Sequence, residues 1–154
     1  MPFRFTGLPL EPFVSYFGMT DAELVASDVK PLIADSKPGY PCRITLEDAE
    51  PGECVLLLSF PHLPGRSPYK ASGPIFVRAC ARQSYDGTDV PPVLRDRLLS
   101  LRAYDAGYMM VDAEIVEGNV VEGMLERLLA RRDVASVHIH NARRGCFACA
   151  VDRL

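Results

Sequence analysis

The sequence predicts one α+β domain, residues 1–154, with a mainly antiparallel, strongly bent sheet and about four short helices packed on one side of it. Three observations support this prediction. The length of 154 residues is the usual size of a single domain. Apolar residues make up 48% and charged residues 24%, as in ordinary globular proteins. Most strand-like segments are joined by short turns, which suit antiparallel pairing, and the regular strand–helix alternation typical of a parallel sheet is absent.

The N-terminal half predicts two short helices and several strands. Pro12 suits the first turn of a helix over residues 13–17. Thr20 and Glu23 have the spacing of a capping box, in which each side chain caps the other's backbone N–H, so a helix is expected from Asp21 to Ala26. Apolar runs bounded by turn residues predict strands over residues 3–5, 29–34, 42–47, 54–60 and 75–81.

The C-terminal half predicts two helices and two hairpins. Pro91 and Pro92 suit the first turn of a helix over residues 91–99. Asn119 and Glu122 predict the N-cap and the third residue of a helix over 120–132. Its apolar face consists of Val121, Leu125, Leu128 and Leu129. The hairpins are expected over residues 101–117 and 134–153.

The segment PHLPGRSPYKASGP, residues 61–74, contains four prolines and two glycines. This composition predicts neither a helix nor a central strand. Long loops of this kind are often functional, and its donors suit an anionic group. The alternative is a surface loop that covers a sheet edge. The candidate binding residues here are Arg66, Tyr69, Lys70 and Ser72.

The formal net charge of −3 disfavours nucleic acid and anionic membranes as main partners. The distribution is uneven, because residues 127–154 carry six arginines against two acidic residues. These arginines predict either a solvated, salt-bridged surface or a local anion site near the C-terminus. The N-terminal segment lacks the apolar run of a secretory signal, and five cysteines is an odd number. We therefore expect a cytoplasmic protein without a disulfide framework.

Cys146 and Cys149 form a CxxC motif within a predicted strand. Residues three apart on a strand point to opposite faces, so we expect no disulfide between them. A zinc site is also disfavoured, because no second CxxC is present. Cys42, Cys54 and Cys80 lie in apolar patterns and are expected to be small core residues.

The last hairpin predicts a histidine face. A three-residue loop, residues 143–145 with a left-handed Gly145, pairs His140 with Ala148 and His138 with Ala150. Phe147 then lies on the apolar core face, and the two histidines lie opposite small residues. These histidines could bind a metal together with a carboxylate such as Asp112, contact a ligand or act in catalysis, or have a structural role.

The function predicted from these patterns is binding of, or action on, a small anionic metabolite. Its pocket is expected where the polar face of the sheet meets the 61–74 loop. Arg102 and Lys70 are expected to hold the anion, His140 to act as acid/base and Tyr69 to form a hydrogen-bonding wall. Cys146 could be a nucleophile paired with His140. Tyr104, Asp112 and His138 complete the predicted lining, and no particular cofactor is indicated. The alternative function is a noncatalytic interaction module that forms a homodimer.

Four segments together resemble a known family. They are PGYPCRITLEDAEPGE, SPYKASGPIFVR, RLLSLRAYD and HIHNARRGCFACAVDR. The sequence that contains them, from about residue 3 to residue 153, is similar to the bacterial proteins catalogued as domain of unknown function 1203. The resemblance implies a single-domain bacterial protein, and it brings no activity, cofactor or catalytic residue with it.

Overall fold

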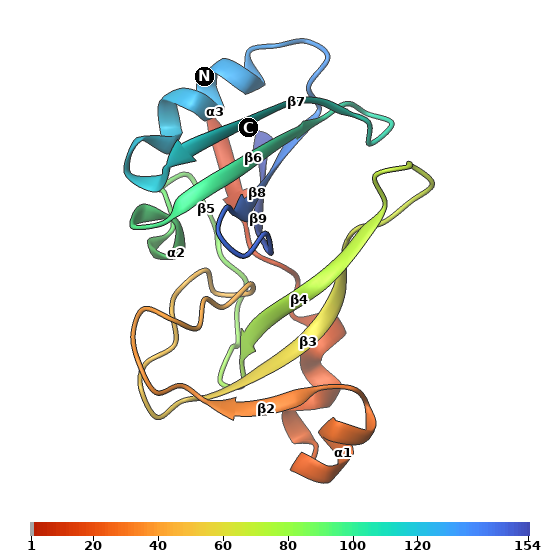
Figure 1. Ribbon diagram of the computed structural model, residues 1–154, viewed down its shortest axis with the longest axis vertical. Coiled ribbons are helices and arrows are strands. Elements are labelled where there is room, and N and C mark those ends of the chain that lie inside the picture. Colours follow the sequence, from red (N-terminus) through yellow and green to blue (C-terminus); the bar gives the residue numbers. More distant parts are fainter. Residues whose placement is uncertain (1) are drawn as a thin grey trace.

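The computed structural model describes residues 2–154 and contains two antiparallel sheets (Figure 1). The larger sheet has the order β5 (Asp86–Gly87), β1 (Phe3–Thr6), β9 (Phe147–Arg153), β8 (Ser136–Asn141), β6 (Leu98–Tyr104) and β7 (Met110–Glu117). The smaller sheet has the order β2 (Lys30–Ile33), β3 (Cys54–Leu63) and β4 (Ala71–Arg78). The α+β class with antiparallel pairing is confirmed, whereas the strands form two sheets rather than one bent sheet.

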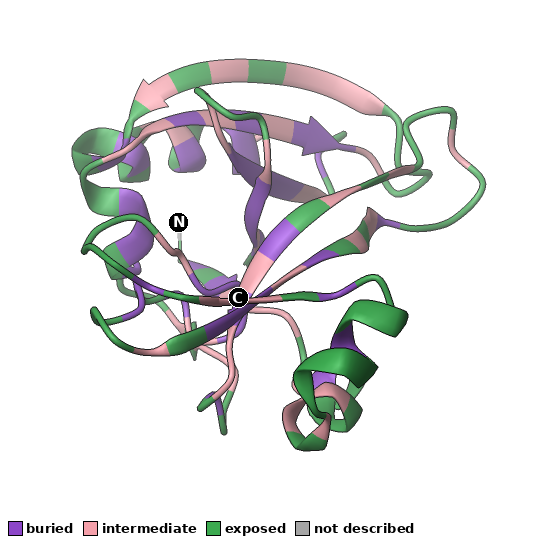
Figure 2. Cartoon of the chain, turned by 60° about the horizontal axis from the view of Figure 1, so that its bottom comes forward, coloured by how far each residue is buried: buried purple, intermediate pink, exposed green. Residues whose placement is uncertain are grey.

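The helices are short and cover both sheets. The helix α3 (Val121–Leu129) buries the predicted face of Val121, Leu125, Leu128 and Leu129 in the core of the larger sheet. The 3₁₀ helix η1 (Glu11–Gly18) and α1 (Asp21–Ala26) pack Phe13 and Leu24 into the core of the smaller sheet. The helices keep exposed residues on their outer sides (Figure 2). Two further single turns are α2 (Pro92–Arg95) and η2 (Gly118–Val120).

The two predicted helix caps have different outcomes. The Thr20 capping box is confirmed, because Glu23 N donates to Thr20 Oγ1 at 3.2 Å and Thr20 N donates to Glu23 Oε1 at 3.1 Å. The Asn119 cap is wrong. Gly118–Val120 form the turn η2, so the N-cap position of α3 falls on Val120, which has no side-chain oxygen to offer. The helix also ends at Leu129 rather than at residue 132.

The 61–74 segment is largely a β-hairpin, so the prediction that it is not part of a central strand is wrong. The strand β3 is central in the smaller sheet and continues to Leu63. Pro61 is tolerated because the pairing shifts between Phe60 and Leu63, where no ladder hydrogen bond is needed. Pro74 lies in the edge strand β4. The tip of this β3–β4 hairpin reaches the β6–β7 turn, where Ser67 Oγ donates to Tyr108 O at 2.6 Å (Figure 1).

The predicted strand over residues 42–47 is instead a tight turn. Leu46 N donates to Cys42 O at 3.0 Å, and Leu46 adopts a φ of 54°. The alternating apolar residues Ile44 and Leu46 resemble a strand pattern, yet they enter different cores. Ile44 packs in the core of the smaller sheet, whereas Leu46 packs in that of the larger sheet. The alternation therefore reflects a bridge between two cores.

The helix predicted over residues 91–99 ends after one turn. It spans only Pro92–Arg95, because Leu98 and Leu99 already belong to β6. That strand pairs with β7 on one side and with β8 on the other. Ladder hydrogen bonds on both sides thus override the local helical pattern.

The final hairpin contains a bulge that changes its faces. Gly145 is left-handed, with a φ of 80°, as predicted. His138 pairs with Ala150, also as predicted, but the register shifts so that His140 lies opposite Phe147 rather than Ala148. The predicted position of Phe147 on the core face is therefore wrong. Its ring lies on the histidine face, whereas Ala148 joins the core.

No helix within residues 2–154 combines the length and the apolar character needed to cross a membrane.

Two glycines provide a test of the close packing around η2. A Cβ on Gly118 would lie 1.6 Å from the carbonyl oxygen of Leu94, so Gly118→Ala must displace the backbone. We expect Gly118→Ala to lower the free energy of unfolding by at least about 3 kcal/mol. Gly123 in α3 has open space around its Cβ position, so the control Gly123→Ala should raise it by about 0.5–1 kcal/mol. Urea denaturation measures both, and equal midpoints would contradict this packing.

Candidate functional site

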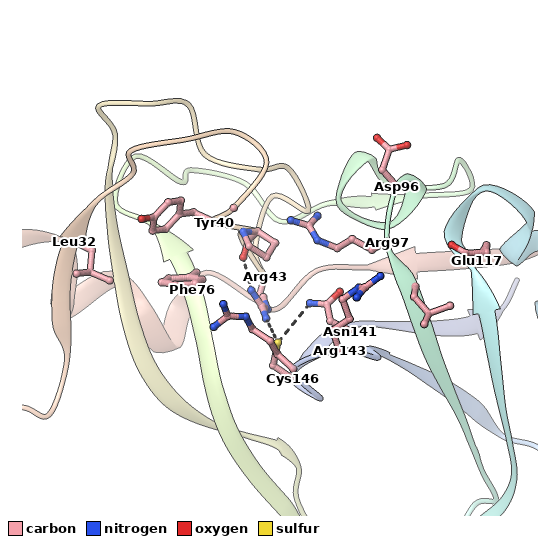
Figure 3. Close-up of a pocket in the computed structure, with 14 residues that line it drawn as sticks. Leu32, Tyr40, Arg43, Phe76, Asp96, Arg97, Glu117, Asn141, Arg143 and Cys146 are labelled. Atoms are coloured by element: carbon pink, nitrogen blue, oxygen red, sulfur yellow. Dashed lines mark hydrogen bonds between the residues drawn. The ribbon is translucent and has the colours of Figure 1, made fainter.

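A cavity of about 550 Å³ opens between the two sheets (Figure 3). The smaller sheet, the 39–43 segment, the start of β6 and the β8–β9 hairpin each contribute to its wall. We call it the Arg43 pocket, after the residue that joins these elements. Its lining includes Leu32, Tyr40, Pro41, Arg43, Phe76, Asp96, Arg97, Glu117, Asn141, Arg143, Arg144 and Cys146.

Arg43 is buried, with only 2% of its surface exposed. Its guanidinium donates from Nε to Phe147 O at 2.7 Å, from Nη1 to Pro41 O, and from Nη2 to Cys146 Sγ at 3.0 Å. Its backbone N donates to Phe76 O at 3.0 Å. One residue thus connects β4 of the smaller sheet with β9 of the larger sheet.

The charge of Arg43 has no acidic partner. No carboxylate of residues 2–154 lies within ion-pair distance of its guanidinium. Burial lowers the pKa of Arg43, the interaction with the Cys146 sulfur partly opposes this lowering, and nearby Arg97 adds to it. Removing a cation from water is costly unless a partner compensates it. The pocket therefore contains a buried cation whose charge is not neutralised by any carboxylate of residues 2–154.

The other arginines of the pocket differ in their pairing. Arg97 forms a two-pronged ion pair with Asp48, at 2.8 and 3.1 Å, so the chain neutralises its charge. Arg143 and Arg144, at the tip of the β8–β9 hairpin, are exposed and have no recorded ion pair within the described residues. They are free to meet a ligand from solvent.

The arginines of residues 127–154 in part form the predicted salt-bridged surface, whereas the alternative, a local anion site, stays a prediction. Arg127 pairs with Glu114 and Arg131 pairs with Asp112, so these arginines form salt bridges beside α3. The hairpin arginines described above instead line the pocket.

The acidic residues of the lining lie at its rim. Asp96 and Glu117 are both exposed. Figure 3 shows the carboxylate of Asp96 directed away from the Cys146 sulfur. Water screens such charges strongly. The charged groups in the inner part of the cavity are therefore guanidinium groups.

One wall of the pocket is apolar. Leu32 from β2 and Phe76 from β4 lie on the side of the smaller sheet. The ring of Tyr40 packs on that of Phe76, with 5.2 Å between their centroids. The pocket therefore offers cations on one side and an aromatic surface on the other.

Cys146 is half-buried and lies in the pocket. Its sulfur accepts from Arg43 Nη2 at 3.0 Å and from Asn141 Nδ2 at 3.5 Å. The oxygen Oδ1 of Asn141 is buried and has no hydrogen-bond partner within residues 2–154. The predicted pairing of Cys146 with His140 is not among the hydrogen bonds of the described chain, because His140 Nδ1 instead faces Gly145 O at 2.9 Å.

The other cysteines have varied environments. Cys149 lies in the core of the larger sheet, separate from Cys146, and both are free thiols. Cys42 is buried as predicted. Cys54 and Cys80 are exposed, so their prediction as core residues is wrong. Cys54 is the first residue of β3 and Cys80 lies in the turn after β4, where an apolar sequence pattern no longer implies burial.

A cluster of aromatic and histidine rings lies behind the pocket, on the other side of Phe147. His62 from β3 stacks on Phe147, with 5.4 Å between ring centroids, and meets His140 edge-on at 5.0 Å. His138 contacts Phe147 at 5.3 Å and Tyr104 at 5.2 Å. His62 was not among the residues predicted for the site. The available signal was that His62 lies two residues after Phe60, so strand alternation places both side chains on the same face.

The structure brings together only part of the predicted site. Arg102 pairs across the sheet with His138, which itself contacts Tyr104. The ring of Tyr69 lies 6.4 Å from that of Tyr104. With His140, these five residues form one neighbourhood where the sheet face meets the hairpin.

Four predicted site residues lie elsewhere. Asp112 pairs across the sheet with Ala103, a core residue, and its carboxylate binds Arg131 at 2.9 Å. It therefore points to the α3 side of the sheet, opposite to the histidines. The other three are exposed on the β3–β4 hairpin and do not line the Arg43 pocket: Arg66, Lys70 and Ser72.

Burial keeps the clustered histidines neutral. It lowers the pKa of His138 to about 4 and that of His140 to about 3, and it also lowers the pKa of His62. The positive charge of Arg102 contributes to all three shifts. One ring nitrogen of each histidine lacks a hydrogen-bond partner within the described chain. Residues 2–154 contain no group of three histidine, cysteine or acidic side chains arranged to hold a metal ion.

A comparison with protein-family models gives one match to this chain. Residues 39–153 match the model described as "Protein of unknown function (DUF1203)". Neither the curated proteins nor the solved structures give a match. The matched region includes the 39–43 segment, the start of β6 and the β8–β9 hairpin.

The histidine cluster predicts a loss of stability in acid. In the unfolded chain, His138 and His140 bind protons as the pH falls below about 6.5. In the folded chain they bind them only near pH 4 and pH 3, so protonation favours the unfolded state between these values. Because both are buried (8% and 1% exposed), we expect each to remove on the order of 3 kcal/mol from the unfolding free energy over that range. Urea melts between pH 7 and pH 4 measure the loss. Histidine NMR titrations with ordinary midpoints near 6.5 would contradict the burial.

Proposed function

The chain belongs to the DUF1203 family of proteins of unknown function, and we propose that it binds a small anionic molecule in the Arg43 pocket. One observation carries the proposal. Arg43 is a buried guanidinium with no carboxylate partner in the described chain, and it faces a cavity that solvent can enter. A bound anion compensates such a charge and thereby lowers the cost of burying it.

The hairpin arginines complete the proposed anion site. A planar guanidinium presents parallel N–H donors that match a carboxylate or a phosphate. Arg143 and Arg144 lie at the tip of a short hairpin, so their side chains can close over an anion that enters the pocket. Asn141 precedes these arginines on the same hairpin, and its side chain lines the same cavity.

The shape of the cavity favours an anionic group attached to an apolar or aromatic body. Its volume of about 550 Å³ lies within the range of small-molecule sites, about 300–1,000 Å³. The Tyr40–Phe76 pair offers an aromatic wall opposite the arginines. A bare inorganic anion would contact the arginines but not the aromatic wall.

Residues of the predicted site that lie outside the pocket have a supporting role in this proposal. His138 and His140 pack on the Phe147 ring, and the Phe147 carbonyl oxygen accepts from Arg43. The histidine cluster thereby fixes the acceptor that orients the guanidinium. The anion site is proposed on the β8–β9 side rather than at the 61–74 segment, because Arg66 and Lys70 are exposed and do not line the cavity.

Thermal unfolding with matched probes tests the proposal. Phenyl phosphate should raise the unfolding temperature more than inorganic phosphate, because its ring fills the apolar wall, and benzyl alcohol should raise it least. We expect Arg143→Ala/Arg144→Ala to weaken phenyl phosphate binding about tenfold or more, since two cations are lost from the pocket.

The control variant Arg66→Ala/Lys70→Ala removes the same charge from the β3–β4 hairpin. It should leave phenyl phosphate binding unchanged. If this hairpin variant abolished binding and the pocket variant did not, the anion site would lie at the 61–74 segment. If no anion raised the unfolding temperature, the proposal would be wrong and the interaction-module alternative would be favoured.

A further inference from the structure

We infer that Cys146 is a thiolation site, at which a small acidic disulfide held by the pocket arginines forms a mixed disulfide with the cysteine sulfur. The inference rests on the proposed function, since the arginines that bind an anion are those that bring an acidic disulfide to the sulfur. It goes further in assigning the pocket a covalent reaction and a class of reactant.

The environment of Cys146 differs from that of the other four cysteines. Cys42 and Cys149 are buried, so a disulfide in solution cannot reach them. Cys54 and Cys80 are accessible, but burial together with nearby Asp21 raises the pKa of Cys54, and burial together with Glu53 raises that of Cys80. The thiolate is the reacting form of cysteine, and these surroundings disfavour it.

Cys146 combines access with a cationic neighbour. Its sulfur lines an open cavity and accepts from the guanidinium of Arg43 at 3.0 Å. The cysteine sulfur is the nucleophile in thiol–disulfide exchange, and the hydrogen bond from Arg43 holds this sulfur at the wall of the pocket. Arg43 is almost fully buried and forms no ion pair with a carboxylate of residues 2–154, so no acidic side chain competes with the sulfur for its guanidinium.

The pocket selects the reactant by charge and by hydrogen bonding. Arg143 and Arg144 precede Cys146 on the same hairpin, line the same pocket and suit carboxylate groups. The Oδ1 of Asn141 has no hydrogen-bond partner within residues 2–154 and can accept from a donor such as an amide N–H. A peptide disulfide that carries carboxylates and amide groups satisfies both requirements. A cationic disulfide meets repulsion from three guanidinium groups.

The reaction balances without a further reagent. The Cys146 thiolate attacks one sulfur of the disulfide, a new sulfur–sulfur bond forms, and the original bond breaks. The departing thiolate takes the electron pair and then a proton from water. The Cys146 sulfur is oxidised and the departing sulfur is reduced. An excess of reducing thiol reverses the exchange, so the modification can be removed.

A mixed disulfide at Cys146 also controls the pocket. It places an acidic group against Arg143 and Arg144 and fills part of the cavity. The modified chain therefore no longer binds an anion there until it is reduced.

The test compares three disulfides on the reduced full-length chain, with peptide mapping by mass spectrometry. The disulfides are glutathione disulfide (acidic), 2-hydroxyethyl disulfide (neutral) and cystamine (cationic). We expect glutathione disulfide to modify Cys146 first, and at least about tenfold faster than cystamine at low salt. The difference should shrink as ionic strength rises.

Variants test which residues cause the preference for an acidic disulfide. Arg143→Ala/Arg144→Ala should remove most of the charge preference, and the matched Arg66→Ala/Lys70→Ala should keep it. Cys146→Ser should lose the fast adduct, whereas Cys54→Ser and Cys80→Ser should retain it. Modification of Cys54 and Cys80 at the same rate as Cys146, or equal rates with all three disulfides, would overturn the inference.

Phenyl phosphate separates this inference from the proposed function. If it raises the unfolding temperature while Cys146 shows no charge preference, the thiolation site is wrong and the anion site stands. If Cys146 shows the charge preference while no anion raises the unfolding temperature, reversible anion binding is wrong and the thiolation site stands.

Discussion

The buried guanidinium of Arg43 is the interaction on which the arrangement of the two sheets depends. Its side chain donates to Phe147 O in β9, and its backbone N donates to Phe76 O in β4, while Leu8 N donates to the Arg43 carbonyl oxygen. Hydrogen bonds from a charged group are stronger than those between neutral groups, and they are costly to lose in a buried place. Because three chain segments meet at this one residue, the position of each sheet fixes that of the other, and the pocket is the space that remains between them.

Phe147 links the Arg43 pocket with the histidine cluster. The Phe147 backbone meets the guanidinium, and the Phe147 ring meets His62, His138 and His140. On one side a cation is held without an acidic partner, and on the other side imidazoles are held neutral by burial. Each group has a protonation state set by its surroundings, which is a frequent property of functional sites. The β9 bulge is what allows a single residue to face both clusters.

Local patterns predicted the parts of this fold that depend on neighbouring residues. The Thr20 capping box and the buried face of α3 are examples, because both are determined within one or two helical turns. Features that depend on distant partners were not predictable in this way. The β9 bulge moves Phe147 to the other face, and the 42–46 turn is hidden in an alternating apolar pattern. The arginine excess over residues 127–154 predicts an anion site near the C-terminus, and that site stays a prediction. Arg43 lies outside this region, in a segment predicted as a strand, so the sequence pattern did not single it out.

The 42–46 turn has a consequence for how the molecule unfolds. Ile44 and Leu46 are two residues apart, and each is fully buried in a different core. Pulling either side chain out of its core strains the turn that holds the other. The two sheets are therefore coupled into one cooperative folding unit in spite of their separate cores, and local opening of one half without the other is disfavoured. Any molecule that binds at the adjacent Arg43 would accordingly stabilise the whole chain against unfolding, including strands that it does not contact.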